Sequence, residues 1–160
     1  MRTLVLGLGN PILTDDGVGI HVVRDLAGRL DRSDVDVAEA SLGGLRLLDV
    51  TAGYDRLILV DAIQAGGRPG RVCRLGLDDM PSLHAACSHD LSLPAALALG
   101  RRLGMALPED QAITIVAVEV EDVLTFGERC TPRVQAAIPR AARLVEEVLA
   151  DASPPQRAAH

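Results

Sequence analysis

Aromatic side chains and cysteines are both scarce in this chain. Its 160 residues include one Tyr, one Phe and no Trp, so a core must be built from aliphatic side chains within the 48% of residues that are apolar. The three cysteines, Cys73, Cys87 and Cys130, are odd in number and far apart, without a Cys-x-x-Cys spacing. This pattern excludes a thiolate zinc or redox motif and predicts buried thiols in a reducing compartment.

Basic residues are fewer than acidic ones, 16 against 22, which gives a net charge of -6. Such a balance predicts no basic patch for the phosphates of nucleic acids. No apolar run reaches the length of a membrane span, and residues 1 to 7 have no long apolar region or cleavage site. We therefore expect a cytoplasmic monomer that has neither a nucleic acid nor a membrane as its partner.

Short apolar runs alternate with amphipathic helical patterns along the chain. Strands are expected at residues 3 to 7, 35 to 40, 56 to 60, 71 to 76 and 113 to 118. Helical spacing of apolar residues occurs from Val18 to Leu30, from 93 to 102 and from Val134 to Val148. The alternation predicts a single three-layer α/β/α domain over residues 1–150, with a mostly parallel twisted sheet of about five strands. Residues 151–160 are expected to form a disordered tail.

Proline and glycine refine this prediction at two places. The glycine-rich turn at 66 to 70 is too short for a crossover helix, so one of the strands it joins should be antiparallel and at an edge. Near the C-terminus, Thr131 and Pro132 have the residue types of a helix N-cap and first turn. Pro139 should kink the helix that follows.

The chain begins with a buried strand that runs into a glycine loop and then into two carboxylates. The loop reads Gly7-Leu8-Gly9-Asn10-Pro11, and it continues to Asp15-Asp16-Gly17-Val18-Gly19. A dinucleotide fingerprint would place its third glycine where Ile12 stands. Asp15 and Asp16 would also repel a phosphate at the start of a helix. A cation is therefore a better ligand for this loop than a nucleotide.

Three potential metal ligands fall at one edge of the predicted sheet. Asp16 follows the first strand, Asp61 ends the third, and His89 precedes a helix. Two carboxylates and an imidazole suit a first-row divalent ion and not a thiolate metal centre. The sequence contains no Glu-x-x-His or His-x-x-x-His helix motif of the kind expected at a permanent zinc site.

Each of these residues also has an ordinary structural interpretation. Asp15 or Asp16 can cap the first helix, Asp61 can simply end its strand, and His89 can be an exposed loop residue, with His84 as a competing ligand. Solvated loop charges are the expectation for the other acidic groups, which are Asp78, Asp79, Asp90, Glu119, Glu121 and Asp122.

The order and spacing of three motifs resemble those of the hydrogenase maturation endopeptidases. The motifs are the opening run from Gly7 to Gly19, then Val60-Asp61-Ala62-Ile63, then Ser88-His89-Asp90-Leu91, and the resemblance covers residues 1 to about 149. Members of that family remove a C-terminal extension from the large-subunit precursor of nickel-iron hydrogenases after nickel insertion. The resemblance implies that Asp16, Asp61 and His89 contact nickel carried by the precursor and serve catalysis, with no resident metal required.

Two departures from the family pattern concern substrate loops. Ala40-Ser41-Leu42 stands where many relatives have Gly-Gly-Thr, and Ser92 stands where some have glycine. No serine or cysteine lies in a recognisable triad, so a metal that polarises the carbonyl and an activated water are the expected chemistry. Asp16 and Asp61 are both candidates for the general base.

Two other functions share parts of the pattern. A nickel-dependent chaperone or checkpoint that holds the immature subunit without cutting it would use the same three residues. Peptidyl-tRNA hydrolases also begin with a strand into Gly-Leu-Gly-Asn-Pro, and His21 falls near the place of their catalytic histidine. Their Arg-His-Asn run is replaced by Ile20-His21-Val22, and the net charge disfavours tRNA, so His21 is expected to be structural.

Overall fold

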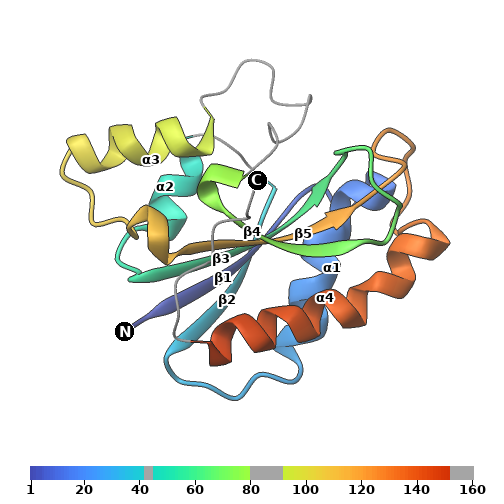
Figure 1. Cartoon of the computed structure of the whole chain (residues 1–160), viewed down its shortest axis with the longest axis horizontal. Helices are drawn as coiled ribbons and strands as arrows, with labels where there is room; N and C mark the ends of the chain where they lie inside the picture. Colours follow the sequence, from blue (N-terminus) through green and yellow to red (C-terminus); the bar gives the residue numbers. More distant parts are fainter. Residues whose placement is uncertain (42–44, 80–91, 152–160) are drawn as a thin grey trace.

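Five strands form one mixed sheet at the centre of the computed structural model, which describes residues 1–41, 45–79 and 92–151 (Figure 1). The strands are β1 (Thr3–Leu8), β2 (Val35–Ala40), β3 (Arg56–Ile63), β4 (Val72–Gly76) and β5 (Ile113–Glu119). Their spatial order is β2-β1-β3-β5-β4, with every pair parallel except β4 and β5. The predicted mostly parallel sheet with one antiparallel edge strand is confirmed.

The connection between β3 and β4, residues 64–71, crosses the end of a third strand. β4 lies beside β5 and not beside β3, so the connection must pass the carboxyl end of β5. Two backbone hydrogen bonds fix it there: the Gly70 N–H donates to the Glu119 carbonyl, and the Glu119 N–H donates to the Arg71 carbonyl, each at 2.8 Å. The short connection therefore makes an edge strand, but not a hairpin of neighbouring strands.

Two helices cover each face of the sheet, as a three-layer domain requires (Figure 1). One face carries α1 (Val18–Ala27) and α4 (Pro132–Ala150), and the other carries α2 (Arg46–Thr51) and α3 (Leu93–Arg102). The sequence patterns predicted three of these helices and missed the short α2. Thr131 and Pro132 are the N-cap and first residue of α4, as predicted, and the helix continues through Pro139 as one element.

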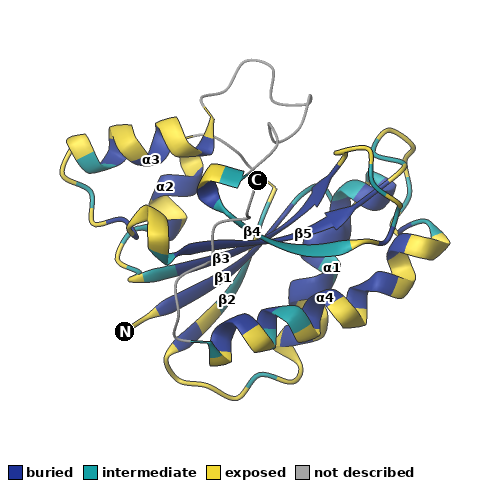
Figure 2. Ribbon diagram, viewed as in Figure 1, coloured by how far each residue is buried: buried dark blue, intermediate teal, exposed yellow. Residues whose placement is uncertain are grey.

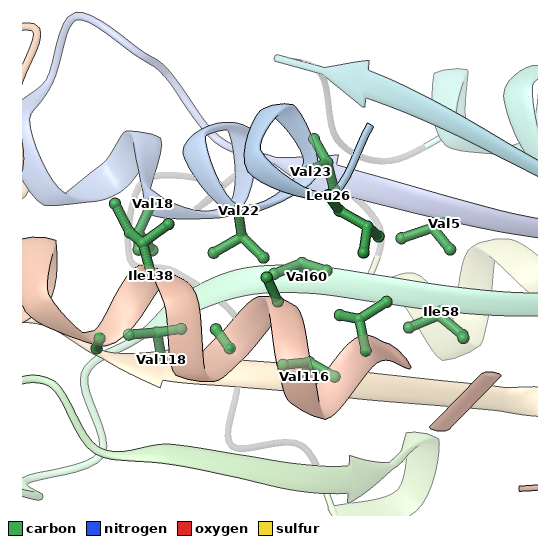
Figure 3. Packing of buried hydrophobic residues seen from close by; sticks show 14 of the residues in the cluster. Val5, Val18, Val22, Val23, Leu26, Ile58, Val60, Val116, Val118 and Ile138 are labelled. Atoms are coloured by element: carbon green, nitrogen blue, oxygen red, sulfur yellow. The ribbon is translucent and has the colours of Figure 1, made fainter. Parts of the chain in front are cut away.

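Alternation along the strands fills two separate aliphatic cores, one on each face of the sheet. The strands are mostly buried, whereas the helices have both buried and exposed positions (Figure 2). In β3, Ile58 and Val60 face α1 and α4, whereas Leu57 and Leu59 face α2 and α3. Figure 3 shows the first core, where strand valines and isoleucines meet Val22 and Leu26 of α1 and Ile138 of α4. Branched aliphatic side chains thus fill the core in a chain that has few aromatic ones.

The structure corrects the predicted ends of the first helix and of the domain. Leu30 packs against the first core from beyond the end of α1, although the spacing placed it on that helix. Asp151, assigned to the tail by sequence, forms an ion pair with Arg74 at 2.9 Å, and residues 152–160 lie outside the described residues. Within the described ranges, no helix has both the length and the apolar character needed to cross a membrane.

Glycines at the start of α1 allow this helix to begin directly against the sheet. A Cβ atom on Gly19 would lie 2.3 Å from the Val60 carbonyl oxygen and 2.5 Å from that of Leu8. A Cβ on Gly7 would lie 2.5 Å from the Gly19 carbonyl oxygen. The glycine spacing of the opening motif therefore serves close backbone packing between β1, β3 and α1.

We expect Gly19→Ala to lower the free energy of unfolding by about 3 kcal/mol, because the new methyl group would overlap backbone that cannot rotate away. Gly28→Ala is the matched control, since its Cβ would meet no atom closer than 3.9 Å and its φ of -73° suits alanine. Guanidinium unfolding of both variants measures the difference, and equal midpoints would contradict this account of the packing.

Candidate active site

A loop folded back on itself places Asp16 at the carboxyl end of β1. Gly9 has φ +134°, and a Cβ there would lie 1.9 Å from the Asp16 carbonyl oxygen. The Asn10 N–H donates a hydrogen bond of 2.9 Å to Asp16 Oδ2. The side chain of Asp16 is half-buried, and its position is set by a backbone that only glycine allows at residue 9.

Asp61 lies within β3 and not at its end, because the strand continues to Ile63. Its side chain is on the face of Leu59 and Ile63, the face covered by α2 and α3, and it is 8% exposed. Asp61 Oδ1 accepts a hydrogen bond of 2.8 Å from the Ala62 N–H. The interpretation that Asp61 merely terminates a strand is therefore wrong; it is a buried carboxylate inside the sheet.

The two acids lie on elements that contact each other near the carboxyl edge of the sheet. β1 and β3 are adjacent and parallel, with Gly7 opposite Val60. Asp61 comes directly after Val60, two residues before the carboxyl end of β3, and the turn η1 that carries Asp16 contacts β3. Open α/β sheets bind their ligands at this edge. Along the sheet, Asp61 has Ala117 of β5 as its partner, and Ala117 is opposite Cys73 of β4.

The third predicted ligand, His89, lies in the segment 80–91, outside the described residues, as do His84 and Asp90. Among the residues that the structure does describe, no group of three or more His, Cys, Asp or Glu side chains is placed to hold a metal ion. The structure thus locates two of the three predicted ligands, Asp16 and Asp61, at one edge of the sheet.

Neither carboxylate of the opening motif caps the first helix. The N-cap of α1 is Gly17, which has no side chain, and Asp15 and Asp16 lie earlier, in the 3-10 turn η1 (Thr14–Gly17). The capping interpretation is therefore wrong for both residues. Two adjacent aspartates are instead in two different environments, since Asp15 is fully buried and Asp16 is half-buried.

Asp15 is an anchor that sequence reasoning missed. Its Oδ2 accepts hydrogen bonds from the backbone N–H groups of Glu121 at 3.1 Å and Asp122 at 3.0 Å. Its Oδ1 accepts one from the Thr131 N–H at 2.7 Å, and the Thr131 hydroxyl donates to the same carboxylate. The β5–α4 loop, residues 120–131, is consequently fastened to the turn that carries Asp16.

Thr14 has an unfavourable backbone conformation at the point where the turn η1 meets the β5–α4 loop. It is a β-branched residue with φ +48°, a conformation that costs about 1–3 kcal/mol and needs support from its surroundings. Support comes from its N–H, which donates 3.0 Å to the Gly127 carbonyl, and from its hydroxyl, which donates to the Thr125 carbonyl. The Gly127 N–H in turn donates 2.9 Å to the Ile12 carbonyl. The two loops therefore form one unit.

The expectation of solvated charges after β5 is wrong for Glu119. Its side chain is 3% exposed, and Oε1 accepts a hydrogen bond of 2.8 Å from the Ala65 N–H of the β3–β4 connection. Glu121 is exposed, as expected. The pKa of Asp122 is lowered by hydrogen bonds from the backbone of Thr125 and Leu124, so this carboxylate stays ionised and holds its own turn.

The described thiols are poor nucleophiles. Burial raises the pKa of Cys130 to about 12, and the nearby carboxylate of Asp15 adds to this effect. Burial also raises the pKa of Cys73; the charge of Arg71 lowers it by less, and the charge of Glu119 adds to the increase. Both therefore remain protonated near neutral pH, whereas a cysteine nucleophile must be a thiolate. Cys87 lies outside the described residues.

His21 has the surroundings of a structural residue. Burial lowers its pKa, and the positive charge of Arg24 adds to that effect. Its Nε2 is buried and has no hydrogen-bond partner among the described residues. A neutral imidazole packed into the surface of α1 fits the role predicted for it.

Comparison with known proteins decides the family. Residues 20–148 match the sequence profile of the family described as hydrogenase maturation protease. The chain belongs to this family. Over 154 residues it is 34% identical to the hydrogenase 2 maturation protease of Escherichia coli K12, covering 94% of this chain and 90% of that protein. It is also 29% identical to the hydrogenase expression/formation protein HupD of Bradyrhizobium diazoefficiens, covering 94% and 79%.

A solved structure supports the same assignment for this maturation protease. The hydrogenase maturating endopeptidase HybD from E. coli superposes with a TM-score of 0.80 at 32% sequence identity, over 94% of this chain and 93% of that one. The protein is therefore a hydrolase that acts on a peptide bond, on a single-domain α/β fold. Membership of this family rules out the peptidyl-tRNA hydrolase alternative.

We expect Asp15→Ala to lower the free energy of unfolding of this protease by about 3 kcal/mol, because three backbone N–H groups would lose a buried acceptor. Asp25→Ala serves as the control, because it removes an exposed ion pair with Arg29, a loss that should cost less than about 1 kcal/mol. Urea unfolding compares them, and a similar small loss in both variants would contradict the anchoring role.

A second prediction concerns alkaline pH. An unfolded thiol ionises near its usual pKa of 9.0, whereas that of folded Cys130 ionises only near 12, so stability should fall as pH rises through this interval. Cys130→Ala should therefore lose less stability between about pH 8 and about pH 10.5 than the unmodified protein does. Urea unfolding at stepped pH measures this slope, and parallel curves for the two proteins would refute the raised pKa.

Proposed function

We propose that this protease removes the C-terminal extension of a nickel-iron hydrogenase large-subunit precursor after nickel has been inserted. The observation that carries the proposal is the position of two carboxylates near the carboxyl edge of the sheet in a chain of the hydrogenase maturation protease family: Asp61 in β3, and Asp16 in the turn η1 that contacts β3. Asp16, Asp61 and His89 are the proposed contacts to the nickel that the precursor carries, and the same residues serve catalysis.

The two described acids are suited to bind an ion without rearrangement. Asp61 belongs to β3, the central strand of the sheet. Asp16 lies in a turn whose position is fixed by contacts with Gly9 and Asn10 and by the hydrogen bonds of Asp15. Because these positions are set by backbone packing, little conformational entropy is lost on binding. Oxygen ligands together with one imidazole accept a borderline divalent ion such as nickel, and ligands from the precursor can complete its coordination.

Hydrolysis then requires an attacking water and a proton acceptor. The water oxygen forms a bond to the scissile carbonyl carbon, the C–N bond breaks, and the proton taken from water passes to the leaving amine. Asp16 or Asp61 is the proposed base for this transfer, because a carboxylate within reach of the water can perform it. The raised pKa of Cys73 and of Cys130 argues against a described thiolate as the nucleophile.

Nickel dependence follows from this arrangement. A precursor without nickel offers no ion for the two carboxylates and the histidine to bind, so its scissile bond is not brought to the site. The protease would then act as a checkpoint that cleaves only precursors whose metal centre already contains nickel.

Mass spectrometry of a nickel-loaded and a nickel-free large-subunit precursor after incubation with this protein tests the proposal. We expect loss of the C-terminal peptide only from the loaded precursor. Asp61→Asn and His89→Ala should lower kcat/KM by a factor of about 100 or more. Asp55→Asn is the control, because Asp55 precedes β3 at its opposite end and binds the Arg2 N–H; its kcat/KM should change less than about twofold.

Three outcomes would change the interpretation. Equal cleavage of the nickel-free precursor would refute the metal requirement. Nickel-dependent binding without cleavage would favour the chaperone or checkpoint function. Full activity of Asp61→Asn, with a melting temperature like that of the unmodified protein, would remove Asp61 from the site.

A further inference from the structure

Four arginines gather around one hollow on the surface of this acidic protein. Arg68 and Arg71 come from the β3–β4 connection, and Arg133 and Arg140 come from α4; the hollow between them has a volume of about 740 Å³. The net charge of -6 predicted no basic patch, but the fold concentrates four of the 16 basic residues at this place. We call it the arginine hollow.

The walls of the arginine hollow are fastened to each other. Gly70 has φ +87°, and a Cβ there would lie 2.7 Å from the Arg133 carbonyl oxygen, so the connection rests directly on the first turn of α4. The guanidinium of Arg140 donates to the Gly70 carbonyl. Buried Glu119 holds the other side of the connection through the Ala65 N–H. The two backbone segments that carry the four arginines are therefore held in a fixed position relative to each other.

The arginines of the hollow are not ion-paired within the described part of the chain. No ion pair there joins Arg68, Arg71, Arg133 or Arg140 to a carboxylate. Arginines elsewhere do form such pairs, for example Arg24 with Glu39 at 2.7 Å. A local excess of four charges in a protein with more acids than bases indicates an anionic partner.

Arg133 and Arg140 are seven residues apart, so they lie two turns apart on one side of α4, with the small side chain of Ala136 between them. Planar guanidinium groups at such intervals can each form paired hydrogen bonds with a carboxylate. The overall negative charge opposes a long polyanion such as a nucleic acid, because most of its phosphates would face a repulsive surface. A short carboxylate-rich peptide fits this local patch better.

We propose that the arginine hollow binds an acidic segment of the large-subunit precursor and so helps to dock it on the protease. The β3–β4 connection, which supplies Arg68 and Arg71, directly follows the strand that carries Asp61. A partner bound at Asp61 can therefore follow this connection to the hollow. This inference rests on the proposed function only for the identity of the partner. The hollow contributes to binding and not to the chemical step.

The test compares Arg68→Glu/Arg133→Glu with the control Arg102→Glu/Arg143→Glu, which changes net charge equally at exposed arginines outside the hollow. With the nickel-loaded precursor, we expect the hollow variant to raise KM about tenfold or more with kcat nearly unchanged. The control should stay within about twofold of the unmodified protein, and the effect should shrink between about 50 and about 300 mM salt.

A second measurement needs no cleavage and separates this inference from the proposed function. Fluorescence anisotropy with a labelled Glu-rich peptide should show salt-sensitive binding to the unmodified protein and the control, and at least about tenfold weaker binding to the hollow variant. A Gln-rich peptide should not bind. Equal peptide affinity of all variants would overturn the inference even if the precursor is cleaved. Tighter binding of a single-stranded oligonucleotide or of inorganic phosphate would also overturn it, in favour of a phosphate ligand.

Discussion

The buried carboxylate of Asp15 is the contact on which the carboxyl edge of the sheet depends. It accepts backbone N–H groups from both ends of the loop between β5 and α4 and also fixes the turn that carries Asp16. A buried carboxylate is costly to desolvate unless hydrogen bonds replace its water, and here several donors do so at once. The position of Asp16, the course of the loop and the start of α4 are therefore set together.

Glu119, the last residue of β5, performs a related task. Its backbone holds Gly70 and Arg71, and its carboxylate holds Ala65, so the β3–β4 connection is tied to the end of β5. A buried acid thus holds each of the two connections by hydrogen bonds: Glu119 holds the β3–β4 connection, and Asp15 holds the β5–α4 loop. This explains how a chain with few aromatic side chains can organise its loops: hydrogen bonds to carboxylates replace the apolar contacts that large side chains would provide.

Several features could be read from local patterns because their physical cause is local. Continuous apolar runs gave the strands, helical spacing of Val134, Ile138 and Val145 marked the buried side of α4, and Thr131 with Pro132 marked its first residue. The rule that parallel strands present their carboxyl ends at one edge predicted Asp16 and Asp61 near that edge, although Asp61 lies within β3 and not at its end. The short helix α2 was missed because six residues are too few for a periodic pattern.

By itself, the sequence determined the three-layer α/β fold and the antiparallel edge strand, since each depends on residue order along a short stretch. Tertiary structure alone decided which acids are buried. Asp15 and Glu119 resemble solvated or capping residues in sequence, and their donors come from segments far away in the chain. It also decided where charge gathers, because the arginine hollow joins residues 68–71 to residues 133–140, and net charge carries no information on such proximity.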